Sequence, residues 1–172
     1  MTLQKHTCTI SGLRPHKLPC DLDLPTLLGK IEDEIRKSVA LGYTVFQVGM
    51  ARGVDIWAAK IVLKIKREFP AVKLKCYRPC DTQADNWDEE WREEYFNILA
   101  VADDVICMQR KYSDGCMRRR NERMIDYSSR LIAVYDGKSI GGTRQIIEYG
   151  RGWGLDIVII NPLDCVKETG NE

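Results

Sequence analysis

The sequence predicts a Rossmann-like α/β fold, a three-layer sandwich in which helices cover both faces of a mainly parallel sheet of about six strands. Apolar runs rich in β-branched residues alternate with longer segments of helical periodicity, as a parallel sheet with crossover helices requires. Three of these runs are followed by glycine-containing loops, where such a sheet passes into its helices. The expected strands are Thr7–Ser11, Thr44–Val48, Lys73–Tyr77, Asp104–Met108, Leu131–Tyr135 and Ile157–Asn161.

Helical spacing defines the first two helices most clearly. In the first, apolar residues recur three or four positions apart over residues 24–39, with Pro25 near the first turn and Gly42 just beyond the end. The second covers residues 54–69, because its apolar stripe continues until Pro70 stops the helix. Both helices are expected to cover the sheet.

Three further helices are predicted from shorter patterns. Residues 87–102 carry an aromatic-to-aliphatic stripe with acidic residues on the other side. A helix over residues 118–128 has few apolar positions. A fifth helix begins at about Thr143 and is expected to be broken by Gly150, Gly152 and Gly154.

A chain of 172 residues is large enough to bury a core, so residues 1–172 are assigned to one domain, with a loosely ordered tail after about residue 163. The net charge of +1 gives no reason in the overall balance to expect a polyanion or an anionic membrane as partner. No segment has the apolar length of a membrane span, and the first ten residues lack an apolar signal core. A cytoplasmic protein is therefore expected.

The seven cysteines indicate a reducing compartment. Cys8, Cys76 and Cys107 lie in apolar, strand-like runs, where a free thiol behaves as a small hydrophobe. Cys76 and Cys80 have no matching second pair, and His6 and His16 are far from them in the sequence. No metal site is expected from this spacing.

The glycine loops predict a pocket for an anion. They cover residues 11–14, 49–53 and 141–143. Glycine lets the backbone approach a ligand, and the following helix presents free amide protons and the positive end of its dipole. Because the carboxyl ends of parallel strands meet at one edge of the sheet, the three loops are expected to share one pocket. Neither GxxxxGK[ST] nor GxGxxG occurs, which argues against a standard ATPase or dehydrogenase.

Four segments of the sequence resemble a known family. SGLRPHKL near the start, GMARGVDIWAAKIVL in the second unit, RRRNERMIDYSSRLIAVYDG further on and the following GGT are similar, in order and spacing, to the YpsA-like (YspA) family of the SLOG superfamily. This superfamily also includes the DNA-processing protein DprA and the cytokinin-activating LOG enzymes. The resemblance covers nearly the whole chain. It implies a Rossmann-like domain that binds nucleotides or nucleotide-derived, ADP-ribose-like signals, with no further cofactor required.

The resemblance also supplies candidate ligand-binding residues and assigns no catalytic residue. In the order of the motifs, the candidates are Gly12 and Arg14, then Gly49, Gly53, Asp55 and Trp57, then Asn121, and finally Gly142 and Thr143.

Physical roles for several of these residues can be argued separately from the family. Arg14 could make a two-pronged contact with phosphate. Asp55 could cap the amides at the start of its helix or accept ribose hydroxyls, and Thr143 could be both a helix cap and a phosphate ligand. Trp57 lies on an apolar stripe, which favours a core position over base stacking. Asn121 could reach the pocket or face water.

Two charged surfaces are expected outside the pocket. Trp87 and Trp91 lie among acidic residues, which favours a solvated acidic helix face, whereas an exposed Trp91 or Tyr95 would suit a homodimer interface. A basic patch could remain solvated, bind single-stranded nucleic acid or polyphosphate, or contact the acidic face of another subunit. Its members are Arg110, Lys111, Arg118, Arg119, Arg120 and Arg123.

The leading hypothesis is the binding or sensing of a nucleotide-type ligand. A LOG-type nucleoside-monophosphate phosphoribohydrolase and DprA-like single-stranded DNA binding remain as alternatives. LOG enzymes carry a glutamate two or three residues after the threonine of the last glycine motif, where this chain has Gln145 and Ile146, and Glu148 follows on a different face. This departure argues against hydrolase activity, although Asp55, Asp136 or Glu148 could act in another geometry.

Overall fold

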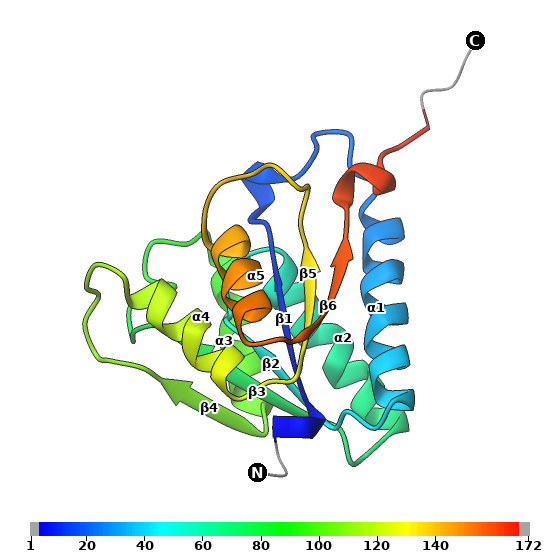
Figure 1. Cartoon of the computed structure of the whole chain (residues 1–172). Helices are drawn as coiled ribbons and strands as arrows, with labels where there is room; N and C mark the ends of the chain where they lie inside the picture. Colours follow the sequence, from blue (N-terminus) through cyan, green and yellow to red (C-terminus); the bar gives the residue numbers. More distant parts are fainter. Residues whose placement is uncertain (1–3, 169–172) are drawn as a thin grey trace.

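Every strand of the central sheet runs parallel to its neighbours, in the order β4-β3-β2-β1-β5-β6 (Figure 1). The computed structural model describes residues 4–168. The strands are β1 (Thr7–Gly12), β2 (Val45–Val48), β3 (Lys73–Arg78), β4 (Asp104–Cys107), β5 (Arg130–Val134) and β6 (Asp156–Ile160). All six predicted strands are confirmed to within one residue at either end, and with them the Rossmann-like α/β class.

Helices cover both faces of the sheet, as Figure 1 shows. Helices α1, α2 and α3 pack on one face, and α4 and α5 pack on the other. The bounds are α1 (Leu24–Ala40), α2 (Val54–Glu68), α3 (Glu89–Val101), α4 (Cys116–Asp126) and α5 (Gly142–Gly152), with short 3₁₀ helices η1 (Gln4–His6), η2 (Pro15–Lys17) and η3 (Pro162–Cys165). None of the helices within residues 4–168 is long and apolar enough to cross a membrane.

The larger core lies between the sheet and the face covered by α1 and α2. Leu27, Ile31 and Ile35 of α1 are fully buried, because their spacing of four residues places them on one side of the helix. They pack in one cluster with Ile10 of β1 and Phe46 of β2, which are also fully buried. A smaller cluster joins α4 and α5 to the opposite face of the sheet.

The order of the strands creates a change of direction between β1 and β5. From β1 the chain builds outward through β2, β3 and β4, and α4 then returns it so that β5 pairs with the other side of β1. The crossover helices therefore leave β1 and β5 on opposite faces of the sheet. Ligands of open parallel sheets bind in the crevice at the carboxyl ends of such a pair of strands.

Three helices begin or end two residues away from the prediction. Helix α3 begins at Glu89 rather than at Trp87, because Trp87 lies in a turn and Asp88 is still extended. Helix α4 begins two residues earlier than predicted and ends two earlier, since Gly115 takes a left-handed φ of 78° just before it. Helix α5 continues through Gly150 to Gly152.

Gly150 lies inside α5 because the helix comes close to the sheet there. A Cβ atom on Gly150 would stand 3.6 Å from Ile157 and 3.7 Å from Leu131, in ordinary contact. The break expected at Gly150 was wrong. The helix ends at Gly152 instead, and Gly154 takes a left-handed φ of 72° beyond it.

The segment after residue 163 is held to the body of the protein as far as residue 167. Asn161 caps η3, Cys165 is buried, and the backbone amide of Lys167 donates to the carbonyl of Asp21 at 2.9 Å. The loose tail predicted after residue 163 was wrong for this part, and residues 169–172 lie outside the described residues.

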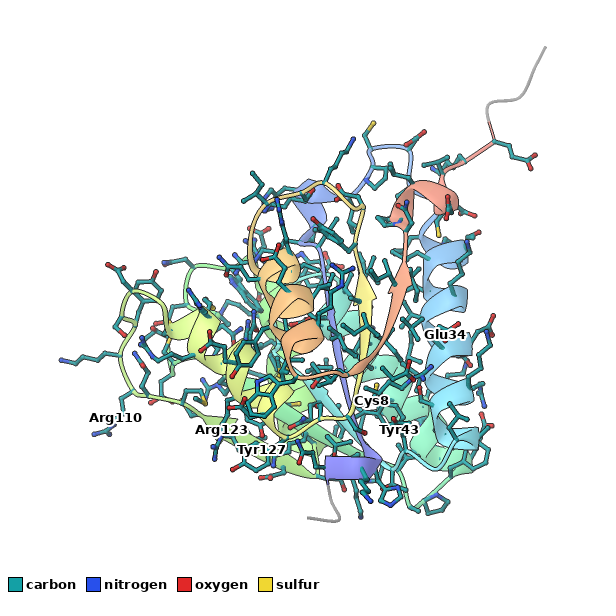
Figure 2. The ribbon with its side chains drawn as sticks, viewed as in Figure 1. Cys8, Glu34, Tyr43, Arg110, Arg123 and Tyr127 are labelled. Carbon is teal, nitrogen blue, oxygen red and sulfur yellow. The ribbon has the colours of Figure 1, made fainter. Side chains whose placement is uncertain are left out.

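An ion cluster around a buried arginine lies at the amino ends of the strands, opposite the glycine loops. Arg130 at the start of β5 is 6% exposed and pairs with Glu34 of α1 and Asp156 of β6. Its guanidinium also lies 5.8 Å from the centre of the Tyr43 ring. Figure 2 labels Glu34 and Tyr43, and also Cys8. Burial raises the pKa of the Cys8 thiol to about 12.

We expect Gly12→Ala to destabilise the fold, because a Cβ at residue 12 would stand 2.6 Å from three side-chain carbons of Val54. The expected loss is about 1–3 kcal/mol in the free energy of unfolding, measured by urea denaturation. Gly29→Ala is the matched control, since a Cβ there meets open space inside α1, and it should gain up to about 1 kcal/mol. Equal stability of the two variants would contradict this account of Gly12.

Candidate functional site

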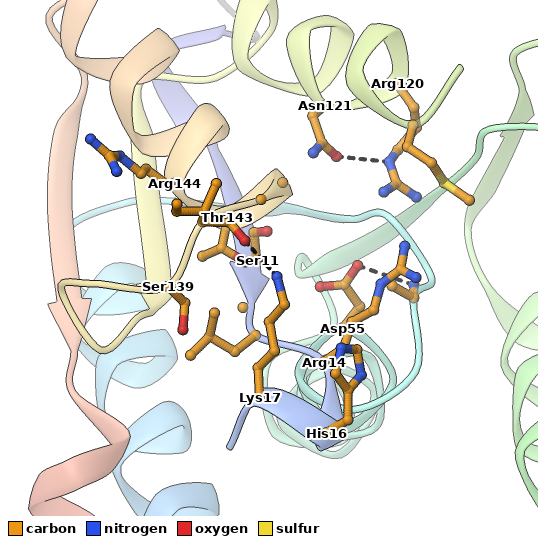
Figure 3. A pocket seen from close by; sticks show the side chains of 17 residues that line it. Ser11, Arg14, His16, Lys17, Asp55, Arg120, Asn121, Ser139, Thr143 and Arg144 are labelled. Atoms are coloured by element: carbon orange, nitrogen blue, oxygen red, sulfur yellow. Dashed lines mark hydrogen bonds between the residues drawn. The ribbon is translucent and has the colours of Figure 1, made fainter. Parts of the chain in front are cut away.

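A cavity of about 230 Å³ opens at the carboxyl ends of β1, β2 and β5 (Figure 3). It lies at the change of direction between β1 and β5. Four segments line it: residues 11–14, 16 and 17 at the end of β1 and after it; residues 51 and 55 after β2; residues 117, 120 and 121 of α4; and residues 139–144 before and within α5. The cavity thus collects chain segments that are far apart in the sequence.

Six of the nine predicted site residues line this cavity. They are Gly12, Arg14, Asp55, Asn121, Gly142 and Thr143. The other three, Gly49, Gly53 and Trp57, do not line it. The predicted meeting of the loops is found, but the loop after β2 contributes Ala51 and Asp55 to the wall instead of its glycines.

The glycines after β2 are explained by close packing. A Cβ on Gly49 would stand 2.6 Å from the guanidinium carbon of Arg120. Gly53 has a φ of 88°, and a Cβ there would stand 2.9 Å from Pro15. Neither position therefore accommodates a side chain in this arrangement.

Trp57 is partly buried on the apolar side of α2, where its place on the apolar stripe predicted it. Its ring centre is 6.1 Å from that of Trp91 on α3, and it packs against the larger core cluster. In this position the ring fills space between α2 and α3. It is not available to stack on a base in the cavity.

The amino end of α5 forms one wall of the cavity. The first N–H groups of a helix have no intrahelical acceptor, and no side chain caps this helix. Gly142 and Thr143, which supply these groups, both line the cavity. The positive end of the helix dipole is therefore directed at the space where an anion would bind.

Two cations without carboxylate partners stand at the same cavity. Within residues 4–168, neither Arg14 nor Lys17 has a carboxylate oxygen within 4.0 Å, whereas Arg144 pairs with Glu148 at 3.0 Å. Lys17 Nζ instead donates a hydrogen bond to the carbonyl of Ile140 at 2.6 Å. In Figure 3 the Lys17 side chain rises toward Thr143 and Ser11.

Asp55 and Arg120 form the buried, charged floor of the cavity. They are 5% and 4% exposed. Burial raises the pKa of the Asp55 carboxyl to about 6, although the Arg120 guanidinium and the N–H of Ala51 favour the ionised form. Burial also lowers the pKa of Arg120, an effect that Asp55 opposes. Asp55 is the single carboxylate among the described residues that line this cavity.

Arg120 is held by the backbone of the β2 loop. Its guanidinium donates to the carbonyl of Gly49 and, at 2.9 Å, to the side-chain oxygen of Asn121. The Gly49 carbonyl also accepts a hydrogen bond from the side-chain amide nitrogen of Gln83 at 3.0 Å. The Tyr95 hydroxyl donates to the side-chain oxygen of Gln83 at 3.1 Å. This network fixes Asn121, which is buried at the cavity wall and does not face water.

Met50 takes a left-handed conformation next to this network. Its φ is 59°, and it is the one non-glycine residue with positive φ among residues 4–168. The side chain is fully buried in the larger core. The backbone then delivers the N–H of Ala51 to the Asp55 carboxylate at 3.1 Å.

The predicted basic patch is divided by the structure. Arg120 is buried in the cavity wall, so its inclusion in the patch was wrong. Arg118 pairs with Glu122 at 2.8 Å, and Arg119 bonds to neighbouring loop groups. In Figure 2, Arg110 points away from the body, and Arg123 lies with Tyr127, whose ring centre is 4.4 Å away.

The acidic helix face is confirmed, but the suggested interface residues on it are not free. Tyr95 is fully buried, and Trp91 is partly buried against Trp57. Phe96, at 47% exposed, is the aromatic residue of α3 that faces outward. Tyr95 is therefore not an exposed residue of this face, contrary to the suggestion from the sequence.

Several cavity residues were missed by the sequence analysis. Lys17 and His16 belong to the first quoted motif, SGLRPHKL, and follow Arg14 closely. Arg120 was obscured by its arginine neighbours, although it stands three residues after Met117 and four before Met124 on the apolar side of α4. Helical spacing alone could have placed Arg120 inward.

The cysteines and histidines form no metal-binding group within the described residues. No set of three or more potential ligands of this kind, carboxylates included, comes together in residues 4–168. Cys76 and Cys80 are buried free thiols, whereas Cys107 is exposed on the edge strand β4, so the core position expected for it was wrong. Burial raises the pKa of Cys76 to about 12, so its thiol stays protonated at neutral pH.

The fold of the chain is shared with a solved structure. The fold is similar to DNA processing protein A from Helicobacter pylori, a structure described for its single-stranded DNA binding mode, with a TM-score of 0.61. The two chains are 17% identical over 88% of this chain and 64% of the other, a likeness that shows the fold alone. The fold thus defines a Rossmann-like α/β domain, with a cavity at the carboxyl ends of its strands.

The chain belongs to the YspA SLOG family, whose model matches residues 8–151. It is also similar to UPF0398 proteins of Bacillus cereus strain G9842 and Bacillus thuringiensis strain Al Hakam, each 38% identical over 104 residues. These matches cover 59% of this chain and 56% of each relative, so the chain spans just over half the length of the curated relatives it matches. The resemblance identified from the motifs is confirmed.

The raised pKa of Asp55 predicts a pH-dependent stability. The folded chain holds the Asp55 proton more tightly than the unfolded chain does. The contribution of Asp55 to the free energy of unfolding is therefore largest below about pH 4 and is lost as the pH rises through 6. The rise of the Asp55 pKa from 3.8 to about 6 corresponds to about 3 kcal/mol in the free energy of unfolding.

Urea denaturation of wild type and Asp55→Asn from pH 4 to pH 7 measures this effect. The wild-type stability should fall relative to that of the variant as the pH rises. Asp33→Asn, at an exposed position of α1, is the matched control and should follow the wild-type profile. A constant difference between wild type and Asp55→Asn would contradict the assignment.

Proposed function

We propose that the chain binds a small, phosphate-bearing ligand of the nucleotide type in the cavity at the carboxyl ends of β1, β2 and β5. The supporting observation is that two cations without carboxylate partners, Arg14 and Lys17, converge there with the free amides of α5. Cations that lie at a helix amino end and form no ion pair with a carboxylate favour an anion from outside.

The buried carboxylate supports a ligand that also carries hydroxyl groups. Asp55 accepts one hydrogen bond from Ala51, and a carboxylate has capacity for several more. A sugar hydroxyl is a donor suited to that capacity. A ligand with phosphate at the α5 end and ribose near Asp55 would match both chemistries of the cavity, which is why we favour a nucleotide over inorganic phosphate.

Isothermal titration calorimetry with AMP, ADP-ribose and inorganic phosphate tests the proposal. Arg14→Ala should weaken the binding of whichever ligand binds most tightly by about 10- to 100-fold, because a charge-assisted hydrogen bond contributes about 1.5–3 kcal/mol. Arg67→Ala, an exposed arginine at the far end of α2, is the matched control and should bind as wild type does. No binding by any of the three ligands would overturn the proposal.

A nucleoside-monophosphate phosphoribohydrolase is the second candidate function. Asp55 is a buried carboxylate at the cavity with a pKa of about 6, which suits a general acid or base near neutral pH. Glu148, in contrast, does not line this cavity and pairs with Arg144. A hydrolase on this scaffold would depend on Asp55.

Base release from nucleoside monophosphates, followed by chromatography at high protein concentration, tests the second candidate. If the chain is a hydrolase, Asp55→Asn should abolish release while Glu148→Gln leaves it nearly unchanged. No release by the wild-type protein would remove the hydrolase and leave ligand binding as the proposed function.

Binding of single-stranded DNA through the basic patch receives less support. Of its members, Arg120 is buried and Arg118 and Arg119 are engaged within the chain, which leaves fewer cations free for a phosphate backbone. The similarity to a DNA processing protein at 17% identity concerns the fold. A gel-shift experiment at low salt that retains a labelled strand would favour this third function.

A further inference from the structure

Lys17 spans the mouth of the cavity. It lies in η2, directly after β1, and its Nζ reaches the carbonyl of Ile140 in the loop between β5 and α5. The two segments are the walls on either side of the cavity (Figure 3). The lysine side chain therefore closes a ring around the space next to the amino end of α5.

The loop that receives Lys17 is firmly built. Asp136 accepts hydrogen bonds from the backbone amides of Lys138 and Ser139, at 3.0 and 2.8 Å, and from the Ser139 hydroxyl. The Tyr135 hydroxyl donates to the Ser139 carbonyl at 2.9 Å. These bonds hold the outer wall of the cavity in place beside the Lys17 contact.

The ammonium group of Lys17 lies in an electrostatically unfavourable place. A Cβ built on Gly141 would stand 2.8 Å from Lys17 Nζ, so the ammonium lies against the residue that precedes α5. A cation at a helix amino terminus opposes the helix dipole. Within residues 4–168, its one hydrogen-bond partner is the Ile140 carbonyl, and no carboxylate compensates it.

An anion at this position would be stabilised by the ammonium and the helix end together, and the gain increases with the charge concentrated there. A phosphomonoester carries about −1.5 to −2 charge at pH 7, whereas a diester carries about −1. Asp55, the single lining carboxylate, follows β2, so it does not share the wall formed by α5 and its loop. The charge arrangement favours the monoester.

We propose that Lys17 makes the cavity selective for a ligand that ends in a phosphomonoester, because it closes the outer side of the anion position and concentrates positive charge there. A phosphate that continues into a second group, as in a diester or an ADP-ribose-like diphosphate, would have to pass between Lys17 and the loop of residues 136–141. This inference rests on the proposed function and narrows it to one class of ligand.

Calorimetry with a matched pair of ligands, AMP and its phosphate methyl ester, tests the inference. The wild-type protein should bind AMP at least about tenfold more tightly than the ester and than ADP-ribose. Lys17→Met keeps the length of the side chain and removes the ammonium. The variant should therefore bind AMP about tenfold more weakly than wild type, with nearly the same affinity for AMP and for the ester.

Lys138→Met is the matched control, since Lys138 belongs to the same loop but does not line this cavity. It should keep the wild-type preference for AMP. If AMP and its ester bind wild type equally, or if Lys17→Met keeps the preference, the role of Lys17 is wrong while nucleotide binding stands. If neither ligand nor ADP-ribose binds, the proposed function fails as well.

Discussion

The contact between the Arg120 guanidinium and the Gly49 carbonyl holds the candidate site together. It ties α4, on one face of the sheet, to the loop after β2, which leads to the opposite face. The contact exists because Gly49 has no Cβ, which would stand 2.6 Å from the guanidinium carbon. Arg120 in turn fixes the amide of Asn121 and lies near enough to Asp55 to influence its ionisation. A charge buried in this way is stable only while its partners stay in place.

The site combines two electrostatic regions that the fold keeps apart. On the β2 side, Asp55 and Arg120 are buried and compensate each other. On the β5 side, the helix end and Lys17 are positive and lack an internal counter-charge. The change of strand order between β1 and β5 places both regions at one crevice. A ligand with an anionic end and a hydroxyl-bearing body would therefore have one orientation in the cavity.

Local patterns in the sequence predicted the six strands, the helices and the glycine loops that meet at one cavity. The spacing of apolar residues and the positions of glycines, on which these predictions rest, are properties of residues close together in the sequence. The order of the strands was not predictable in this way, since β5 lies beside β1 through contacts between distant segments. The same limit explains the errors at the site. Gly49 and Gly53 were interpreted as ligand-facing, but their partners, Arg120 and Pro15, are far away in sequence. Gly150 was interpreted as a helix breaker, but it packs on β5 and β6, and no local pattern in the sequence shows those contacts.

The left-handed conformation of Met50 links the interior of the protein to the site. A non-glycine residue in this region costs about 1–2 kcal/mol, yet its side chain is fully enclosed by the core. Glycine would relax the backbone and leave a void, and a β-branched residue would fill the space at greater conformational cost. Few residue types satisfy both demands. The hydrophobic interior thus sets the angle at which the chain presents the Ala51 amide to Asp55, and repacking around Met50 would change the acidity of Asp55 through the backbone.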